Sequence, residues 1–455
     1  MTDFGYWSLT PTVVVIAIAI WSRRPVAALL AGVLFGLLLL SPTNVIGNLA
    51  DTTLNVMQDE TIGWVVMVCG LMGSLIYLLI ITGGAFAFAS TMARRANTRN
   101  KTLLVTWLLG MVMFIDDYLN AIAIGNSMRK VTDQFKVSRA MLSYVVDSTA
   151  APTCVLVPIS TWAVFFAGVL ESTQIATRGE GIWLYISGIP FMFYPIIALF
   201  LVPIVATGKF PLLGLMKKAE AAAARGTFAL EPAEEIDVAI GPVDKKGEPR
   251  SNLWVFLLPL LSLIGFSAYF DIDLLRGIIA TLMITIPALI ILKLVSAHQA
   301  LDGVLEGFKL MLAPLAIVVV AFMFKTVNDQ LGLPEFVIEQ VTPLMSPLVF
   351  PVIVFLTMAL VAFATGSSWG VFAIAIPIVM PLGDAMGVPI SLTIGALLSA
   401  SAFGSHACFY GDATVLSAQS SGVSVMEHAL SQLPYALIAA LLASVAFIGA
   451  GALLM

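Results

Sequence analysis

Long apolar runs separated by short polar stretches dominate the 455-residue sequence. A helix that crosses the hydrocarbon core of a bilayer needs about 20 mostly apolar residues. The pattern therefore predicts an all-α polytopic membrane protein with about ten crossings. The predicted apolar runs are 8–21, 25–41, 64–92, 102–128, 138–170, 183–206, 253–270, 274–295, 308–327, 349–383, 389–420 and 433–454.

Basic residues between the runs indicate which loops stay in the cytoplasm, because loops rich in Lys and Arg are retained there. Arg23 and Arg24 place the first loop inside and the N-terminus outside. The run at 102–128 has basic residues on both flanks, yet it is too short for two crossings. We therefore expect a re-entrant helical hairpin whose tip, at 114–118, reaches the bilayer midplane.

The run at 138–170 is too long for one plain span, and the polar stretch 147–153 interrupts it. Pro152 lacks a backbone N–H and disfavours helix at the preceding residue, so a broken helix is expected. Such backbone survives at membrane depth only where protein or a water-filled cavity covers it. The long polar stretch 208–252 is predicted to be a cytoplasmic linker with an amphipathic helix over 213–225.

A weak internal repeat relates the two halves of the chain at a shift of about 251 residues. The shift places 114–124 on 365–375. Each half holds about five transmembrane helices, an odd number, so the second repeat is inverted relative to the first. Two inverted repeats with broken elements at the midplane are the plan of secondary transporters. The predicted segments are a first repeat at 1–207 with hairpin 102–128 and broken helix 138–170, the linker at 208–252, and a second repeat at 253–455 with hairpin 349–383 and broken helix 389–420.

The composition excludes several classes of protein. Hydrophobic residues make up 60% of the chain and charged residues 11%, with a mean hydropathy of +1.01. Soluble domains carry about 25% charged residues, so a soluble enzyme is excluded. The net charge of -5 also disfavours a nucleic-acid partner. The expected partner of the apolar surface is the lipid bilayer. No nucleotide, metal-ligand or Ser-His-Asp motif stands at membrane depth, so we expect no cofactor and no enzymatic activity.

Ionisable side chains at the hairpin tip and the break are the strongest candidates for a functional site. A charged side chain at the bilayer centre costs about 2.5–3.5 kcal/mol, and no Lys or Arg is predicted at the depth of Asp116, Asp117 and Asp147. Such acids can hold either a proton or a hard cation, so we expect Na⁺ to bind at these three residues. The other candidate site residues are Asn120, Ser148, Thr149 and Thr153 in the first half, and Thr365, Ser367, Ser368, Trp369, Ser399, Ser401, His406, Asp412 and Thr414 in the second.

Structural roles stay open for several of these side chains. Hydroxyls inside membrane helices often bond only to their own backbone. Asp147 can cap the following half-helix, and His406 can be a hydrogen-bonded structural histidine. Trp369 is expected to pack around a site rather than bind the ligand. Glu427 and His428 are expected to lie on a cytoplasmic loop.

Two motifs of the first half, FIDDYLN at 114–120 and DSTAAP at 147–152, resemble the NhaC family of Na⁺/H⁺ antiporters, within the ion transporter superfamily. The stretches 363–370 and 432–436 resemble the same family. The resemblance implies a fold with a hairpin-containing transport domain and a scaffold, commonly homodimeric. Because the family also includes carriers of organic acids and amino acids, the resemblance implies either a small cation or a small organic substrate as the transported partner.

One departure from the family pattern widens the choice of substrate. Where family members usually carry an acid and a Ser-Pro pair, this chain has Ser405 and Cys408-Phe409. We predict exchange of Na⁺ for H⁺ across the bacterial cytoplasmic (inner) membrane. The alternative is a Na⁺- or H⁺-coupled carrier of an amino acid or small organic acid, with Trp369 and Tyr410 as walls. A passive channel is disfavoured because two hairpins block the middle of the membrane.

Overall fold

All regular structure in the described ranges is helical, as the apolar pattern predicted. Among the described residues, eight helical stretches are long and apolar enough to cross a membrane, and a pair bent by 54°, 181–191 with 193–206, is a ninth when it is counted as one span. Shorter apolar helices of 10–17 residues account for further predicted runs. The chain is thus a multi-pass membrane protein. The computed structural model describes residues 4–22, 24–93, 97–177, 179–231, 251–341, 345–365, 368–409 and 411–455.

Helices break in the first half where polar residues interrupt the apolar runs. The run at 102–128 forms two helices, α6 and α7, separated by 113–116. The run at 138–170 breaks at Ala150, as Pro152 predicts, and breaks a second time at 157–160, which was not predicted. The helices up to residue 223 are α1 Thr10–Ser22, α2 Pro25–Leu40, α3 Val45–Met57, α4 Glu60–Ile81, α5 Gly84–Ala93, α6 Arg99–Val112, α7 Asp117–Gln134, α8 Arg139–Thr149, α9 Ala151–Leu156, α10 Thr161–Ser172, α11 Gly181–Gly188, α12 Phe193–Ala206 and α13 Gly214–Ala223.

One boundary in the second half corrects a prediction. The last helix begins at Val425 rather than 433, because Ser424 caps it by accepting the N–H of Glu427 at 3.1 Å. Glu427 and His428 therefore lie on a helix, and their assignment to a cytoplasmic loop was wrong. The helices from residue 254 are α14 Trp254–Tyr269, α15 Leu274–Ile291, α16 Ala297–Leu310, α17 Leu312–Gln330, α18 Leu333–Val341, α19 Phe350–Thr365, α20 Ser368–Ala385, α21 Ile390–Ala407, α22 Asp412–Ser421 and α23 Val425–Leu454.

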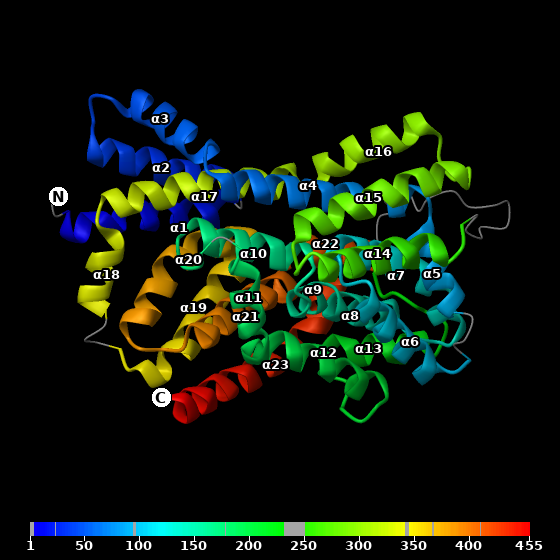
Figure 1. Ribbon diagram of the computed structural model, residues 1–455. Helices are drawn as coiled ribbons and strands as arrows, with labels where there is room; N and C mark the ends of the chain where they lie inside the picture. Colours follow the sequence, from blue (N-terminus) through cyan, green and yellow to red (C-terminus); the bar gives the residue numbers. More distant parts are fainter. Residues whose placement is uncertain are drawn as a thin grey trace.

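The broken and polar helices form the interior of the molecule. Figure 1 shows α8, α9 and α21 between a layer that contains α2, α4 and α17 and a layer that contains α12, α13 and α23. In the stretch from α8 to α10, 78% of an apolar segment of 18 residues is buried inside the protein. In α23 the buried share of such a segment is 28%. The helices that carry most of the predicted site residues are thus enclosed by protein, as non-helical backbone at membrane depth requires.

Two glycines allow the interior helices to approach closely. A Cβ on Gly110 of α6 would lie 2.0 Å from Oγ1 of Thr149, at the end of α8. A Cβ on Gly125 of α7 would lie 2.1 Å from Oγ of Ser420, on α22. Small residues at helix crossings let backbones pack tightly in membranes. These contacts hold α6 against α8 and α7 against α22, around the breaks.

Candidate functional site

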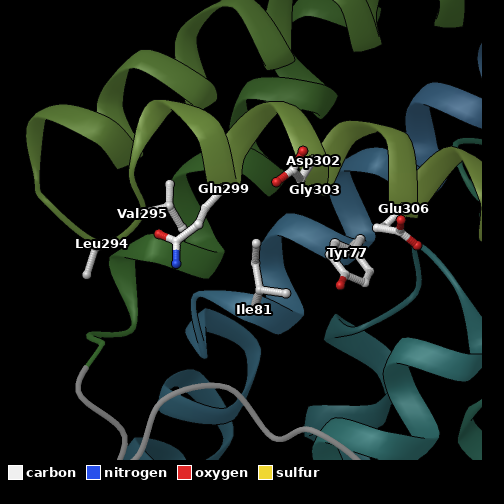
Figure 2. Close-up of a pocket in the computed structure, with 8 residues that line it drawn as sticks. All are labelled: Tyr77, Ile81, Leu294, Val295, Gln299, Asp302, Gly303 and Glu306. Atoms are coloured by element: carbon white, nitrogen blue, oxygen red, sulfur yellow. The ribbon is translucent and has the colours of Figure 1, made fainter.

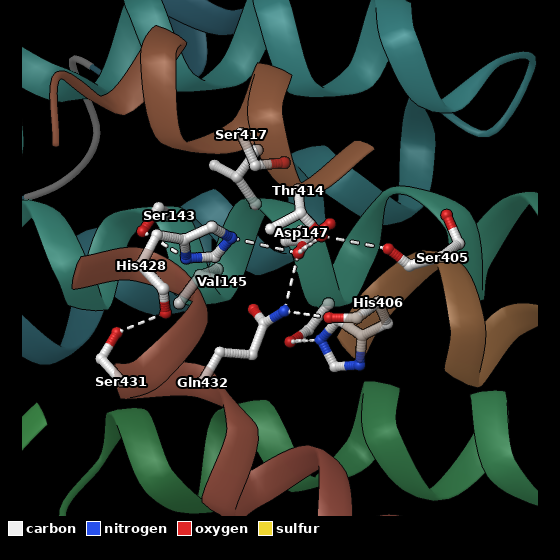
Figure 3. Close-up of polar contacts among 12 residues, drawn as sticks. Ser143, Val145, Asp147, Ser405, His406, Thr414, Ser417, His428, Ser431 and Gln432 are labelled. Atoms are coloured by element: carbon white, nitrogen blue, oxygen red, sulfur yellow. Dashed lines mark hydrogen bonds and ion pairs between the residues drawn. The ribbon is translucent and has the colours of Figure 1, made fainter. Parts of the chain in front are cut away.

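Asp147, near the C-terminal end of α8, is the centre of a buried polar group drawn from three helices (Figure 3). Its Oδ2 accepts hydrogen bonds from Nε2 of Gln432 at 2.7 Å and from Nε2 of His428 at 3.1 Å, both on α23. Oγ1 of Thr414, on α22, lies 3.4 Å from Oδ2 and 3.1 Å from the carbonyl of Ser405, and these two acceptors share its one hydrogen. We call these four residues the Asp147 centre. It joins a first-half acid to three second-half side chains.

His428 contacts a carboxylate through one ring nitrogen and a hydroxyl through the other. Nε2 lies 3.1 Å from Oδ2 of Asp147, which is an acceptor. Nδ1 lies 2.8 Å from Oγ of Ser143, a hydroxyl that also reaches the carbonyl of Ala140 at 3.1 Å. Because a hydroxyl can donate to the ring or accept from it, these contacts accommodate both the neutral imidazole and the imidazolium ion. Both members of the His428–Asp147 pair are fully buried.

Two buried oxygens of the Asp147 centre lack a hydrogen-bond partner within the part of the chain that the structure describes. The amide nitrogen of Gln432 donates to Oδ2 of Asp147 and to the carbonyl of His406, which are both acceptors and so fix the orientation of the amide. Oε1 of Gln432 and Oδ1 of Asp147 are buried and have no hydrogen-bond partner among the described residues. Buried acceptors without donors are costly, and a proton or a hard cation would satisfy them.

His406, at the end of α21, lies beside the Asp147 centre and contacts two further hydroxyl groups. Its Nε2 lies 2.8 Å from Oγ of Ser148, and its Nδ1 lies 2.7 Å from the hydroxyl of Tyr194. A hydroxyl can donate or accept, so both partners can adjust to any protonation state of the ring. The structure thus brings the predicted residues Ser148 and His406 together beside Asp147.

Asp116 and Asp117 lie at a different place, where α7 begins. Asp116 caps α7, because Oδ1 accepts the N–H of Tyr118 at 3.0 Å and of Leu119 at 3.2 Å. Oδ1 of Asp117 accepts the indole N–H of Trp162 at 3.3 Å. Both acids are buried, and none of the ion pairs found among the described residues includes them.

The neighbours of these two acids come from both halves of the chain. Oδ2 of Asp412 accepts the hydroxyl of Tyr118 at 3.0 Å. The rings of Trp162 and Trp369 pack with their centroids 5.3 Å apart. Asp412 and Trp369 are therefore close to the α7 acids, and Trp369 packs against the residue that binds Asp117.

Asn120 joins the two first-half breaks. Its amide nitrogen donates to the carbonyls of Gly110 at 2.8 Å, Thr149 at 2.9 Å and Met113 at 3.2 Å. The hydroxyl of Thr149 bonds to its own helix backbone, whereas Oγ1 of Thr153 and Oδ1 of Asn120 have no partner among the described residues. Asn120 thus satisfies carbonyls that the broken helices expose.

The remaining second-half hydroxyls contact backbone groups. Ser368 and Ser401 each donate to the carbonyl of the other, at 3.3 and 3.1 Å, which ties α20 to α21. Ser399 accepts the N–H of Tyr194 at 3.3 Å, and Thr365 donates to the carbonyl of Ala362 at 3.4 Å. These contacts place them in helix packing rather than in the Asp147 centre. The predicted residues Ser367 and Tyr410 lie outside the described residues.

His428 and Gln432 were missed by the sequence predictions, although a signal for them exists. Ser424 and Glu427 form the S-x-x-E pattern that starts helices, which extends α23 back to 425. On that helix, positions 428 and 432 are four residues apart and share one face. A buried His and Gln on one face of an apolar helix would then have been candidates.

A pocket on α16 offers no comparable site. It has a volume of about 460 Å³ and lies between α4 and α16, with Asp302 and Glu306 in its wall (Figure 2). Asp302 already pairs with His298 at 2.7 Å, and Glu306 pairs with Lys309 at 2.6 Å. No group of three His, Cys, Asp or Glu side chains within the described residues is arranged to hold a resident metal ion.

Enclosed acids at helix breaks, inside a bundle of membrane-spanning helices, define a membrane transporter rather than an enzyme. Residues 173–452 match the Na⁺/H⁺ antiporter family, which covers more than half of the sequence. The chain belongs to the Na⁺/H⁺ antiporter family, as its motifs predicted.

Similar proteins come from several bacteria. An uncharacterised protein of Haemophilus influenzae is 28% identical over an alignment of 487 residues that covers 99% of this chain and 92% of that protein. A malate-2H⁺/Na⁺-lactate antiporter of Bacillus subtilis is 32% identical over 87 residues, 19% of each chain. MtrF of Neisseria gonorrhoeae, an antimetabolite efflux pump, has a similar fold, with a TM-score of 0.54, 13% identity and coverage of 90% of this chain and 85% of that one.

Proposed function

We propose that this secondary transporter exchanges Na⁺ for H⁺ at the Asp147 centre. The observation that carries the proposal is the placement of His428, whose Nε2 lies 3.1 Å from the carboxylate of Asp147 in a fully buried pair. With His428 protonated, the centre holds one positive and one negative charge. A buried charge that loses its partner is strongly unfavourable, so the centre stays neutral as it changes state.

Neutrality makes proton and cation compete. When His428 loses its Nε2 proton, Asp147 keeps its negative charge and its ring partner no longer compensates it. A Na⁺ ion restores neutrality, and the unpartnered oxygens Oδ1 of Asp147 and Oε1 of Gln432 supply hard ligands for it. When the proton returns, Na⁺ is released because both charges cannot be held in the same buried centre. One centre that holds either ion, and not both, performs exchange.

The predicted inverted repeats supply the frame for this exchange. Asp147 comes from the first repeat, 1–207, and Thr414, His428 and Gln432 come from the second, 253–455. A site between the repeats is where a relative movement of the two halves changes access from one side to the other. A second acidic site consists of Asp116, Asp117 and Asp412, and we assign it to a second proton or cation. The proposed setting is a homodimer in the bacterial cytoplasmic membrane.

Reconstituted protein tests the proposed exchange. A pulse of Na⁺ outside proteoliposomes that contain a pH-sensitive dye is expected to move protons in the opposite direction. The variant Asp147→Asn is expected to abolish this proton movement. The control variant Asp302→Asn, which changes an acid of the α16 pocket, is expected to retain it. Wild-type protein that moves no protons between about pH 6 and pH 9, or an unimpaired Asp147→Asn, rejects the proposal.

A second candidate is the coupled transport of an organic acid or amino acid. The Trp162–Trp369 pair next to Asp117 provides an aromatic wall, and Ser405 stands where the family usually has an acid. The Bacillus subtilis relative is named for malate and lactate. This function predicts that malate, lactate or an amino acid raises the unfolding temperature only when Na⁺ is present. A screen in which none of them does so leaves the cation as the only cargo.

A further inference from the structure

The segment that follows α12 is more than a connection between the halves. Residues 210–231 carry α13, which matches the amphipathic helix predicted at 213–225, and they contact the N-terminal ends of α8 and α23. We call residues 210–231 the linker clasp. The rest of the predicted linker, 232–250, lies outside the described residues.

The first anchor of the linker clasp is Glu220, a nearly buried acid on α13. Its Oε1 accepts both the N–H and the hydroxyl of Ser138, at 2.9 and 2.8 Å. Its Oε2 pairs with Arg99 at 2.6 Å. Ser138 is the N-cap of α8 and accepts the N–H of Met141 at 3.0 Å. Glu220 therefore completes the cap and adds a negative charge at the positive end of α8.

The second anchor ties the linker clasp to α23. Oε2 of Glu427 accepts the N–H of Glu231 at 2.7 Å, and the N–H of Ser424 donates to the carbonyl of Glu231 at 2.9 Å. Three residues earlier, the carbonyl of Phe228 accepts the N–H of Arg139 at 2.8 Å. The backbone at 228–231 thus bridges the first residues of α8 and α23.

A third contact lies further along α23. The hydroxyl of Tyr435 accepts the N–H of Leu213 at 2.9 Å. The Tyr435 ring packs on Tyr144 of α8, with centroids 5.0 Å apart, and on Phe210 at 6.3 Å. The start of the linker clasp therefore touches α23, and its end touches both α8 and α23.

We propose that the linker clasp positions α8 against α23, so that Asp147 meets His428 and Gln432, with Glu220 and Glu427 as positioning residues. This inference rests on the proposed function, because it takes the Asp147 centre as the transport site. A simple connection needs no buried carboxylate, since burying one is costly unless it is paired. A shift of about 1 Å between the helices would take the 3.1 Å bond from His428 to Asp147 outside hydrogen-bonding range.

Hydrogen–deuterium exchange on the purified full chain tests the coupling directly. Glu220→Gln removes the charge of the α8 anchor, and we expect faster exchange at 424–432 as well as at 138–147. Glu427→Gln removes the charge of the α23 anchor, and we expect faster exchange at 138–147 as well as at 424–432. Glu171→Gln is the matched control, because Glu171 also accepts two backbone N–H groups, at 2.9 and 3.0 Å, at the end of α10. Changes confined to the helix nearest each substitution overturn the inference.

A transport readout separates positioning from simple structural support. Glu220→Gln is expected to weaken the apparent affinity for Na⁺ by at least about threefold, with less effect on the maximal rate. An unchanged Na⁺ affinity also overturns the inference. If Glu220→Gln does not fold, Arg99→Gln disrupts the same anchor from its other side and is judged by the same criteria. If Asp147→Asn still exchanges ions, the proposed function fails, and the hydrogen–deuterium exchange still decides whether the linker clasp couples the helices.

Discussion

Replacing His428 by Gln isolates the role of its positive charge. Gln keeps a hydrogen-bond donor near Asp147 but carries no charge, so the buried carboxylate loses its counter-ion. Removing one partner of a buried ion pair costs about 3–5 kcal/mol. Gln432 still donates to Oδ2 of Asp147, so we expect a loss near 3 kcal/mol.

Sodium ions should restore most of the lost stability, because they replace the missing charge. At a concentration 100 times the dissociation constant, a ligand stabilises the folded state by about 2.7 kcal/mol. The variant is also expected to bind Na⁺ more tightly than wild type, because no proton on His428 competes, and to lose proton exchange.

Unfolding of the purified protein, followed in NaCl and in N-methylglucamine chloride of equal ionic strength, measures both effects. The double variant Asp147→Asn/His428→Gln lacks both the carboxylate and the imidazolium charge, so it should recover stability without Na⁺ and lose the additional Na⁺ stabilisation seen in His428→Gln. A single His428→Gln variant that is as stable as wild type without Na⁺, or that Na⁺ does not stabilise, would refute the charge-compensation argument.

Three further substitutions test neighbouring parts of the account. Gln432→Ala removes the unpartnered Oε1 and one donor to Asp147, and should weaken Na⁺ affinity about tenfold in ²²Na⁺ uptake; unaltered uptake would exclude Gln432 as a ligand. Asn120→Asp turns a donor into an acceptor that faces three carbonyls, and should lower the stability measured by denaturant unfolding by about 1–3 kcal/mol; wild-type stability would show that this amide is dispensable. Gly110→Ala should cost about 1–3 kcal/mol in the same assay, whereas Gly63→Ala, with no atom within 4 Å of its Cβ, should cost little; equal effects would contradict the close packing of α6 on α8.

Local patterns in the sequence were enough to predict the all-helical class and the helix break next to Pro152, whereas the role of Asp147 as a site residue stays a prediction. Apolar length and a proline act within a few residues, so a single chain reveals them. The same reasoning placed Asp116 in an ion site, and its Oδ1 also has the contacts of an N-cap. A carboxylate at a helix start can have both roles, so the ion site at Asp116 stays a prediction.

The partners of Asp147 could not be predicted in the same way. His428 lies 281 positions away along the chain, and no local pattern encodes contacts at such a separation. The apolar run that marked the last helix began only at 433, so the polar first turn of α23 was assigned to a loop. Most second-half hydroxyls, such as Ser368 and Ser401, proved to bond to backbone, because nearby carbonyls are the commonest partners of membrane hydroxyls.

The central claim is that a proton and a Na⁺ ion replace one another at the Asp147 centre. Proton release from purified protein upon Na⁺ binding, measured with a pH indicator in weakly buffered detergent solution, tests this claim most directly. The account predicts release of about one proton for each Na⁺ bound by the wild type, and none by His428→Gln. Binding of Na⁺ to the wild type without proton release, at every pH between about 6 and 9, would contradict it.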